Sequence, residues 1–136
     1  MAELNGGHLV ARTLRQAGVG HIFTLCGGHI LPIYDGCVTE NVQVVDMRHE
    51  QACAHAADAY ARLTRNLGVA VVTAGPGVTD AVTGIANAFS ARSPVLLIGG
   101  AAPLGLRGLG SLQEVEQVDL LMTVVEDRLA PIPTAY

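Results

Sequence analysis

Residues 68–90 read GVAVVTAGPGVTDAVTGIANAFS, and this stretch decides the fold. Its first part, through Ala74, is almost wholly apolar and rich in valine, as expected of a strand buried on both faces of a sheet. The turn Gly75-Pro76-Gly77 follows, and a helical pattern then runs from Val78 to Ser90. A strand, a glycine-rich turn and a helix in this order are typical of one unit of a parallel α/β sheet.

The same alternation extends in both directions from this unit. Asn5 is the expected N-cap of the first helix, and Gly18 the left-handed residue that ends it. We expect helices over residues 5–17, 32–37, 49–65, 78–90 and 112–121, and strands over 19–25, 42–45, 68–74, 94–99 and, as a fifth candidate, 122–125. The pattern predicts a doubly wound α/β fold, with a mostly parallel sheet and helices on both faces. One domain is expected over residues 1–126, and an irregular, proline-bearing tail over 127–136.

Composition narrows the function. The chain has 136 residues, a net charge of −4 and eight arginines but no lysine. The acidic balance argues against nucleic acid, and the missing lysine excludes a Schiff-base or phosphate-loop lysine. No apolar run approaches the roughly 20 residues of a membrane span, and no secretory signal is recognisable, so a cytoplasmic protein is expected. The three cysteines are too widely spaced for a metal site; we expect them in the core, and we expect no metal site.

Unusual residues follow the ends of the predicted strands. They are Cys26-Gly27-Gly28-His29, Arg48-His49-Glu50, the turn after residue 73, and Gly99-Gly100. Ligands of open parallel sheets bind beyond these carboxyl ends, so a site is expected there. A dinucleotide fits poorly, because Asp80 stands where the fingerprint's third glycine belongs.

Glu50 begins a helix whose next turns are nearly all alanine. One interpretation is a glutamate that stabilises the positive end of the helix dipole. The other is a partly desolvated carboxylate that shares a proton with a heterocyclic nitrogen, because an alanine-rich helix packs closely against its neighbours. The residues alone leave both open.

Several ordered motifs resemble the N-terminal pyrimidine-binding domain of thiamine diphosphate enzymes, most of all acetolactate synthase and acetolactate-synthase-like proteins. They are RHEQ at 48–51, AADAYAR at 56–62, TAGPGVT at 73–79, GIANA at 84–88 and GSLQEV at 110–115. The resemblance runs from about Gly6 to about Val125. It implies that Glu50 hydrogen-bonds N1′ of the aminopyrimidine, which stabilises the imino tautomer that removes the thiazolium C2 proton.

Other roles follow from the same resemblance. Gly27 and Gly28 match a loop beside the active site, and His29 matches a histidine that relays protons in some relatives. Pro76 and Gly77 match the turn that packs against the pyrimidine. Thr73, which precedes this turn, is also expected to bind the cofactor. Gln113 matches a polar residue that faces the reacting carbon.

Simpler roles remain open for some of these side chains. His29 could instead cap the short helix after its loop, and Gln113 could lie on the surface of a helix. His49 and His55 are expected to be structural. Asp80 stands where relatives often carry asparagine, which puts an amide contact there in doubt.

The family's Gly-Asp-Gly motif, which holds magnesium and the diphosphate, does not occur in this sequence. The resemblance therefore implies that the chain binds only the pyrimidine half of thiamine diphosphate, with magnesium and, in some members, FAD held by other domains. It further implies a homodimer or a partner chain carrying the diphosphate-binding domain. The expected activity is decarboxylation and carboligation of 2-oxo acids. The alternatives are part of a 2-hydroxyacyl-CoA lyase or an oxalyl-CoA decarboxylase-like enzyme, or a noncatalytic association module.

Overall fold

A computed structural model describes residues 4–125. The elements in chain order are α1 (Gly6–Gln16), β1 (His21–Thr24), the 3₁₀ turn η1 (Gly28–Ile30), α2 (Leu31–Glu40), β2 (Gln43–Asp46), α3 (Glu50–Thr64), β3 (Gly68–Val72), α4 (Pro76–Ser90), β4 (Val95–Gly99), η2 (Leu104–Leu106) and α5 (Gln117–Met122). The predicted tail over 127–136 lies outside the described residues. No helix among the described residues is long and apolar enough to cross a membrane.

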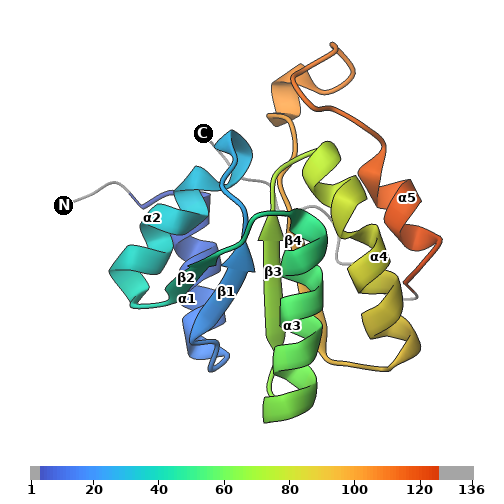
Figure 1. Ribbon diagram of the computed structural model, residues 1–136. Coiled ribbons are helices and arrows are strands. Elements are labelled where there is room, and N and C mark those ends of the chain that lie inside the picture. The colour runs from blue at the N-terminus through green and yellow to red at the C-terminus, as the bar shows by residue number, and fades with distance from the viewer. Residues whose placement is uncertain (1–3, 126–136) are drawn as a thin grey trace.

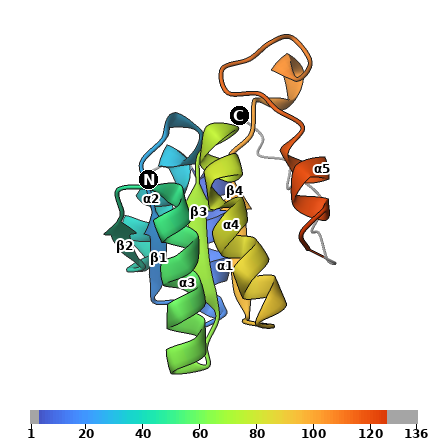
Figure 2. The same cartoon turned by 45° about the vertical axis from the view of Figure 1, so that its right-hand side comes forward.

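The four strands form one parallel sheet in the order β2-β1-β3-β4. Alternate residues of β3 enter different cores. Val69 and Val71 pack with α1 and α2, whereas Ala70 and Val72 pack with α3 and α4. Figures 1 and 2 show the resulting layers, with α3 and α4 on one side of the sheet and α1 on the other. The predicted doubly wound α/β fold is confirmed.

Local signals explain most helix boundaries. The Asn5 side chain accepts a hydrogen bond from the His8 N–H and caps α1, and Gly18 follows that helix with φ +82°. Both were expected. Pro76 occupies the first turn of α4, where its missing N–H costs nothing.

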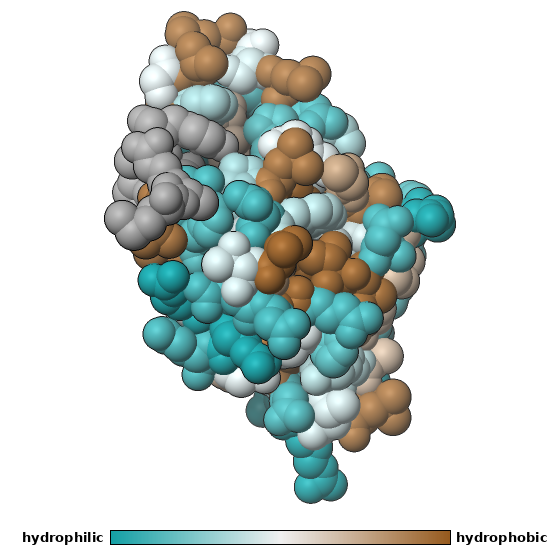
Figure 3. All heavy atoms as spheres, turned by 90° about the vertical axis from the view of Figure 1, so that its left-hand side faces the viewer, coloured by the Kyte–Doolittle hydropathy of each residue, from teal (hydrophilic) through white to brown (hydrophobic). Residues whose placement is uncertain are grey.

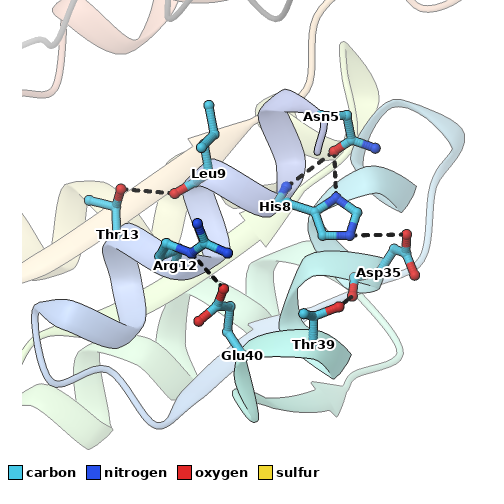
Figure 4. Close-up of polar contacts among 8 residues, drawn as sticks. All are labelled: Asn5, His8, Leu9, Arg12, Thr13, Asp35, Thr39 and Glu40. Carbon is cyan, nitrogen blue, oxygen red and sulfur yellow. Dashed lines mark hydrogen bonds and ion pairs between the residues drawn. The ribbon is translucent and has the colours of Figure 1, made fainter. Parts of the chain in front are cut away.

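Glycines let the helices approach closely. A Cβ on Gly7 of α1 would clash with the Pro32 main chain in α2, and one on Gly36 would lie 2.8 Å from the Gly7 carbonyl oxygen. Figure 4 shows the polar contacts that flank this crossing. The buried His8 lies between the Asn5 amide oxygen and the Asp35 carboxylate, and Arg12 donates to Glu40 at 2.8 Å. Packing and polar contacts thus join α1 to α2.

The structure differs from the expectations in the C-terminal part. The helix expected over 112–121 begins only at Gln117, because Gln113 has a left-handed φ of 61°. The strand expected over 122–125 is wrong: a turn follows Met122, and Val125 packs against the core between the sheet and α3 and α4 instead of extending the sheet.

The three cysteines differ in burial. Cys37 and Cys53 are fully buried, as expected, and burial raises the pKa of the Cys37 thiol to about 11 and that of Cys53 to about 12. Cys26 is exposed, so its assignment to the core is wrong. It follows β1 in the loop that leads to η1, outside both hydrophobic clusters.

Candidate functional site

Every segment with unusual residues reaches the same end of the sheet. In Figure 1 the loop after β1, the first turns of α3 and α4, and the segment after β4 all lie beyond the carboxyl ends of the strands. The parallel topology requires this, because each strand leaves the sheet at that edge.

Glu50 is the first residue of α3 and is half-buried. Its carboxylate faces the turn after β3, since a Cβ added to Gly77 would lie 3.3 Å from Glu50 Oε1. That Cβ would also lie 2.9 Å from Thr73 Cγ2. A side chain at position 77 would therefore clash with Thr73 and crowd the carboxylate, so glycine permits the close approach of this turn to Glu50.

The ends of β1 and β3 are in direct contact. A Cβ on Gly27 would clash with the Thr73 side chain, so only glycine permits this approach. Thr73 is 6% exposed, and its hydroxyl is 3.1 Å from His29 Nδ1. Neither η1 nor α2 has a side-chain cap, so the interpretation of His29 as a helix cap is wrong. Gly28 is exposed and has no atom near its added Cβ, so its role stays a prediction.

Gln113 approaches the site through its main chain. A Cβ on Gly75, whose φ is +60°, would clash with the Gln113 carbonyl oxygen. Gln113 precedes α5, so the alternative of a surface helix residue is wrong. It also borders a cavity of about 160 Å³, together with Ala74, Ala102, Arg107 and Gln117.

Gln117 is a residue that the sequence reasoning missed. Its Oε1 accepts from the Gly75 N–H at 3.1 Å, and its Nε2 donates to the Gly100 carbonyl at 2.6 Å. No local pattern marks it, because both partners are main-chain groups from other segments.

His49 caps α3, as its Nδ1 accepts from the Gln51 N–H at 3.2 Å. Its Nε2 therefore carries a proton and faces Asp80 Oδ2 at 3.8 Å. His49, Glu50 and Asp80 have the spacing of a metal-binding group. The His49 ring, however, offers no free lone pair there, so this arrangement is that of a helix cap whose neutral ring lies near a carboxylate. His55 is exposed on α3.

The AADAYAR and GIANA motifs join α3 to α4. The buried Asp58 carboxylate accepts from Arg62 Nε at 2.8 Å, from Arg62 Nη2 at 2.7 Å and from Asn87 Nδ2 at 2.8 Å. The hydrogen bonds from Arg62 are the main reason that the pKa of Asp58 lies below its usual value. Close packing adds to this, since a Cβ on Gly84 would lie 2.5 Å from Ala54 Cβ. These contacts hold the two helices whose first turns carry Glu50 and Gly77.

Residues 4–120 match the family described as thiamine pyrophosphate enzyme, N-terminal TPP binding domain. The chain is 53% identical over 116 residues to 2-hydroxyacyl-CoA lyase 2 of Danio rerio and, over the same length, to that of Homo sapiens. It is 44% identical over 121 residues to the acetolactate synthase large subunit IlvG of Mycobacterium tuberculosis. These alignments cover 85%, 85% and 89% of this chain, but only 19%, 18% and 22% of the respective relatives. The chain thus spans about a fifth of the length of the relatives it matches.

Proposed function

This chain belongs to the thiamine pyrophosphate enzymes, as an N-terminal TPP-binding domain, and from this premise we propose that it binds the aminopyrimidine half of thiamine diphosphate beside Glu50. The observation that carries the proposal is the half-buried Glu50 carboxylate, which faces the glycine turn at the start of α4.

The residues present suit an aminopyrimidine. A planar ring needs an apolar surface to lie on, and Pro76, the exposed residue of the turn Gly75-Pro76-Gly77, offers one at the start of α4. A ring nitrogen that carries a proton needs an acceptor, and Glu50 is the half-buried carboxylate at this position. The fit concerns the pyrimidine half of the cofactor, since the Gly-Asp-Gly motif does not occur in this sequence.

Each residue has a definite part in this proposal. Glu50 accepts a hydrogen bond from the ring nitrogen and can exchange a proton with it, while His49 fixes the start of α3 by capping it. Thr73 orients the His29 ring through their 3.1 Å contact, which makes His29 a candidate proton relay. Held beside Glu50, thiamine diphosphate would supply nucleophilic catalysis at a substrate carbonyl.

For the whole enzyme, we propose cleavage or formation of a carbon–carbon bond next to a carbonyl. The 53% identity to 2-hydroxyacyl-CoA lyase 2 favours a lyase over the acetolactate synthase reaction, for which the identity is 44%. Magnesium, the diphosphate and, in a synthase, FAD would be held by residues other than those described. A partner chain that carries the diphosphate-binding domain would supply them, since a second copy of this sequence also lacks the Gly-Asp-Gly motif. Figure 3 shows apolar residues gathered near the middle of the face seen from the α1 and α2 side. Leu9 of α1 and Leu31 and Val38 of α2 are exposed apolar side chains. Such a face suits association with another chain.

The test uses the free aminopyrimidine alcohol, 4-amino-5-hydroxymethyl-2-methylpyrimidine, which needs no diphosphate site. We expect its titration, followed by NMR, to shift the amides near Glu50 and Gly77 of the whole chain. Loss of a charge-assisted hydrogen bond in Glu50→Gln should weaken binding about tenfold or more. Glu116→Gln, an exposed glutamate, is the matched control. Equal binding by Glu50→Gln and the wild type would contradict the proposal.

A further inference from the structure

Gln117 connects the ends of two strands that are neighbours in the sheet. Its amide oxygen accepts from the Gly75 N–H, three residues beyond β3, and its amide nitrogen donates to the carbonyl of Gly100, directly beyond β4. The regular pairing of the two strands ends just before this point, at Val72 and Gly99. The side chain therefore continues the connection where main-chain pairing stops.

The group that Gln117 holds has an unusual conformation. Gly75 has φ +60° and ψ −109°, a combination of backbone angles that residues other than glycine rarely adopt. A Cβ on Gly75 would clash with the Gln113 carbonyl oxygen, so there is no room for a side chain at this position. The turn is thus held by the main chain of Gln113, which precedes α5, and by the side chain of Gln117, the first residue of α5.

The next two residues of this turn form part of the proposed pyrimidine site. Gly77 lies two positions after Gly75 and faces Glu50 Oε1. Since Gly75 is the N-cap of α4, any rotation of its main chain moves the start of that helix. The position of Gly77 relative to the carboxylate consequently depends on Gly75.

We propose that Gln117 is a positioning residue for the pyrimidine site, acting through the main chain of Gly75. This inference rests on the proposed function for its ligand, but the contact with Gly75 can be tested alone. The chemistry requires an amide. A glutamate at this position would keep the acceptor for Gly75 but would place a carboxylate oxygen against the Gly100 carbonyl, and a methionine would lose both hydrogen bonds.

The experiment compares wild-type chain with Gln117→Met, Gln117→Glu and the control Gln16→Met, which removes the same amide from an exposed position at the end of α1. Hydrogen exchange of individual amides is measured by NMR. In Gln117→Met we expect the Gly75 amide to exchange at least tenfold faster, with shift changes that reach Gly77 and Glu50. Core amides of β3 should keep their wild-type rates, which also confirms that the variant folds. Gln117→Glu should restore part of the Gly75 protection.

The same variants are then titrated with the aminopyrimidine alcohol. Binding about tenfold weaker in Gln117→Met, but unchanged in Gln16→Met, supports the positioning role. Unchanged Gly75 exchange in Gln117→Met overturns it, and so does faster exchange with unchanged binding. If wild-type chain does not bind the probe, the proposed function fails by itself. In that case, shift changes at Gly77 and Glu50 in Gln117→Met still support the positioning of the turn by Gln117, and their absence overturns it.

Discussion

Replacement of Asp58 by alanine should destabilise the fold by about 2–3 kcal/mol at neutral pH. The carboxylate accepts three hydrogen bonds, two from Arg62 and one from Asn87. Hydrogen bonds to charged groups contribute about 1.5–3 kcal/mol each, although such values are not additive within one network. Breaking a fully buried ion pair costs about 3–5 kcal/mol. The expected loss is smaller here because the Arg62 side chain is 47% exposed and can return to water.

The pH dependence gives this prediction its sharper form. The pKa of Asp58 is lowered in the folded chain, chiefly by the hydrogen bonds from Arg62. Its contribution to stability is therefore complete above the unfolded value, near 3.9 for a free aspartate, and is lost as the pH falls through the folded value. The difference between wild type and Asp58→Ala should be largest at pH 6–7 and should shrink in acid below about pH 4.

Urea unfolding of both proteins across this pH range, followed by circular dichroism, measures the difference. Asp119→Asn, an exposed aspartate of α5, serves as the control and should change the unfolding free energy by less than about 0.5 kcal/mol. A difference below 1 kcal/mol at neutral pH, or one that stays constant into acid, would refute the reasoning.

Two further predictions concern single residues. Gly75→Ala should cost about 2–4 kcal/mol in urea unfolding, because it adds both a strained φ and a clash with the Gln113 carbonyl; Gly105→Ala, where no atom lies near the added Cβ, should be close to neutral. Iodoacetamide should add one carbamidomethyl group to the folded chain, at the exposed Cys26, and three after unfolding, since burial raises the pKa of the Cys37 and Cys53 thiols. Mass spectrometry of the intact protein counts the added groups. Rapid labelling of Cys53 in the native state would contradict the structure.

The sequence predicted best where local and tertiary preferences agree. The β3–α4 unit combines an apolar run that is buried on both faces with a turn that only glycine and proline form well, so its limits were predictable to within a few residues. Residues 111–116 are the opposite case. Glu114 accepts hydrogen bonds from the N–H groups of Gly108 and Ser111, and these contacts hold a loop where the apolar spacing favours a helix.

Some residues of the candidate site were predicted from the sequence, and others were not. Glu50 and Gly77 were predicted from motifs, and the structure brings them together. Gln113 does reach the turn, but through its carbonyl group, which no side-chain argument could anticipate. Gln117 was missed because its partners, Gly75 and Gly100, are close to it only after the sheet has formed.

The parallel sheet also constrains how the chain folds. Every strand pairing joins segments separated by a helical crossover: β1 pairs with β2 around α2, β3 with β4 around α4, and Phe23 with Ala70 across two helices. Residues 4–125 contain no hairpin that could act as a local nucleus, so loop-closure entropy opposes each of these pairings before its contacts form, and refolding should be slow. Glu50 lies in the connection between β2 and β3, Thr73 and Gly77 lie in the connection between β3 and β4, and Gln117 follows β4. Their arrangement should therefore appear only in the last stage of folding. A molecule that binds there would consequently distinguish the native chain from its partly folded intermediates.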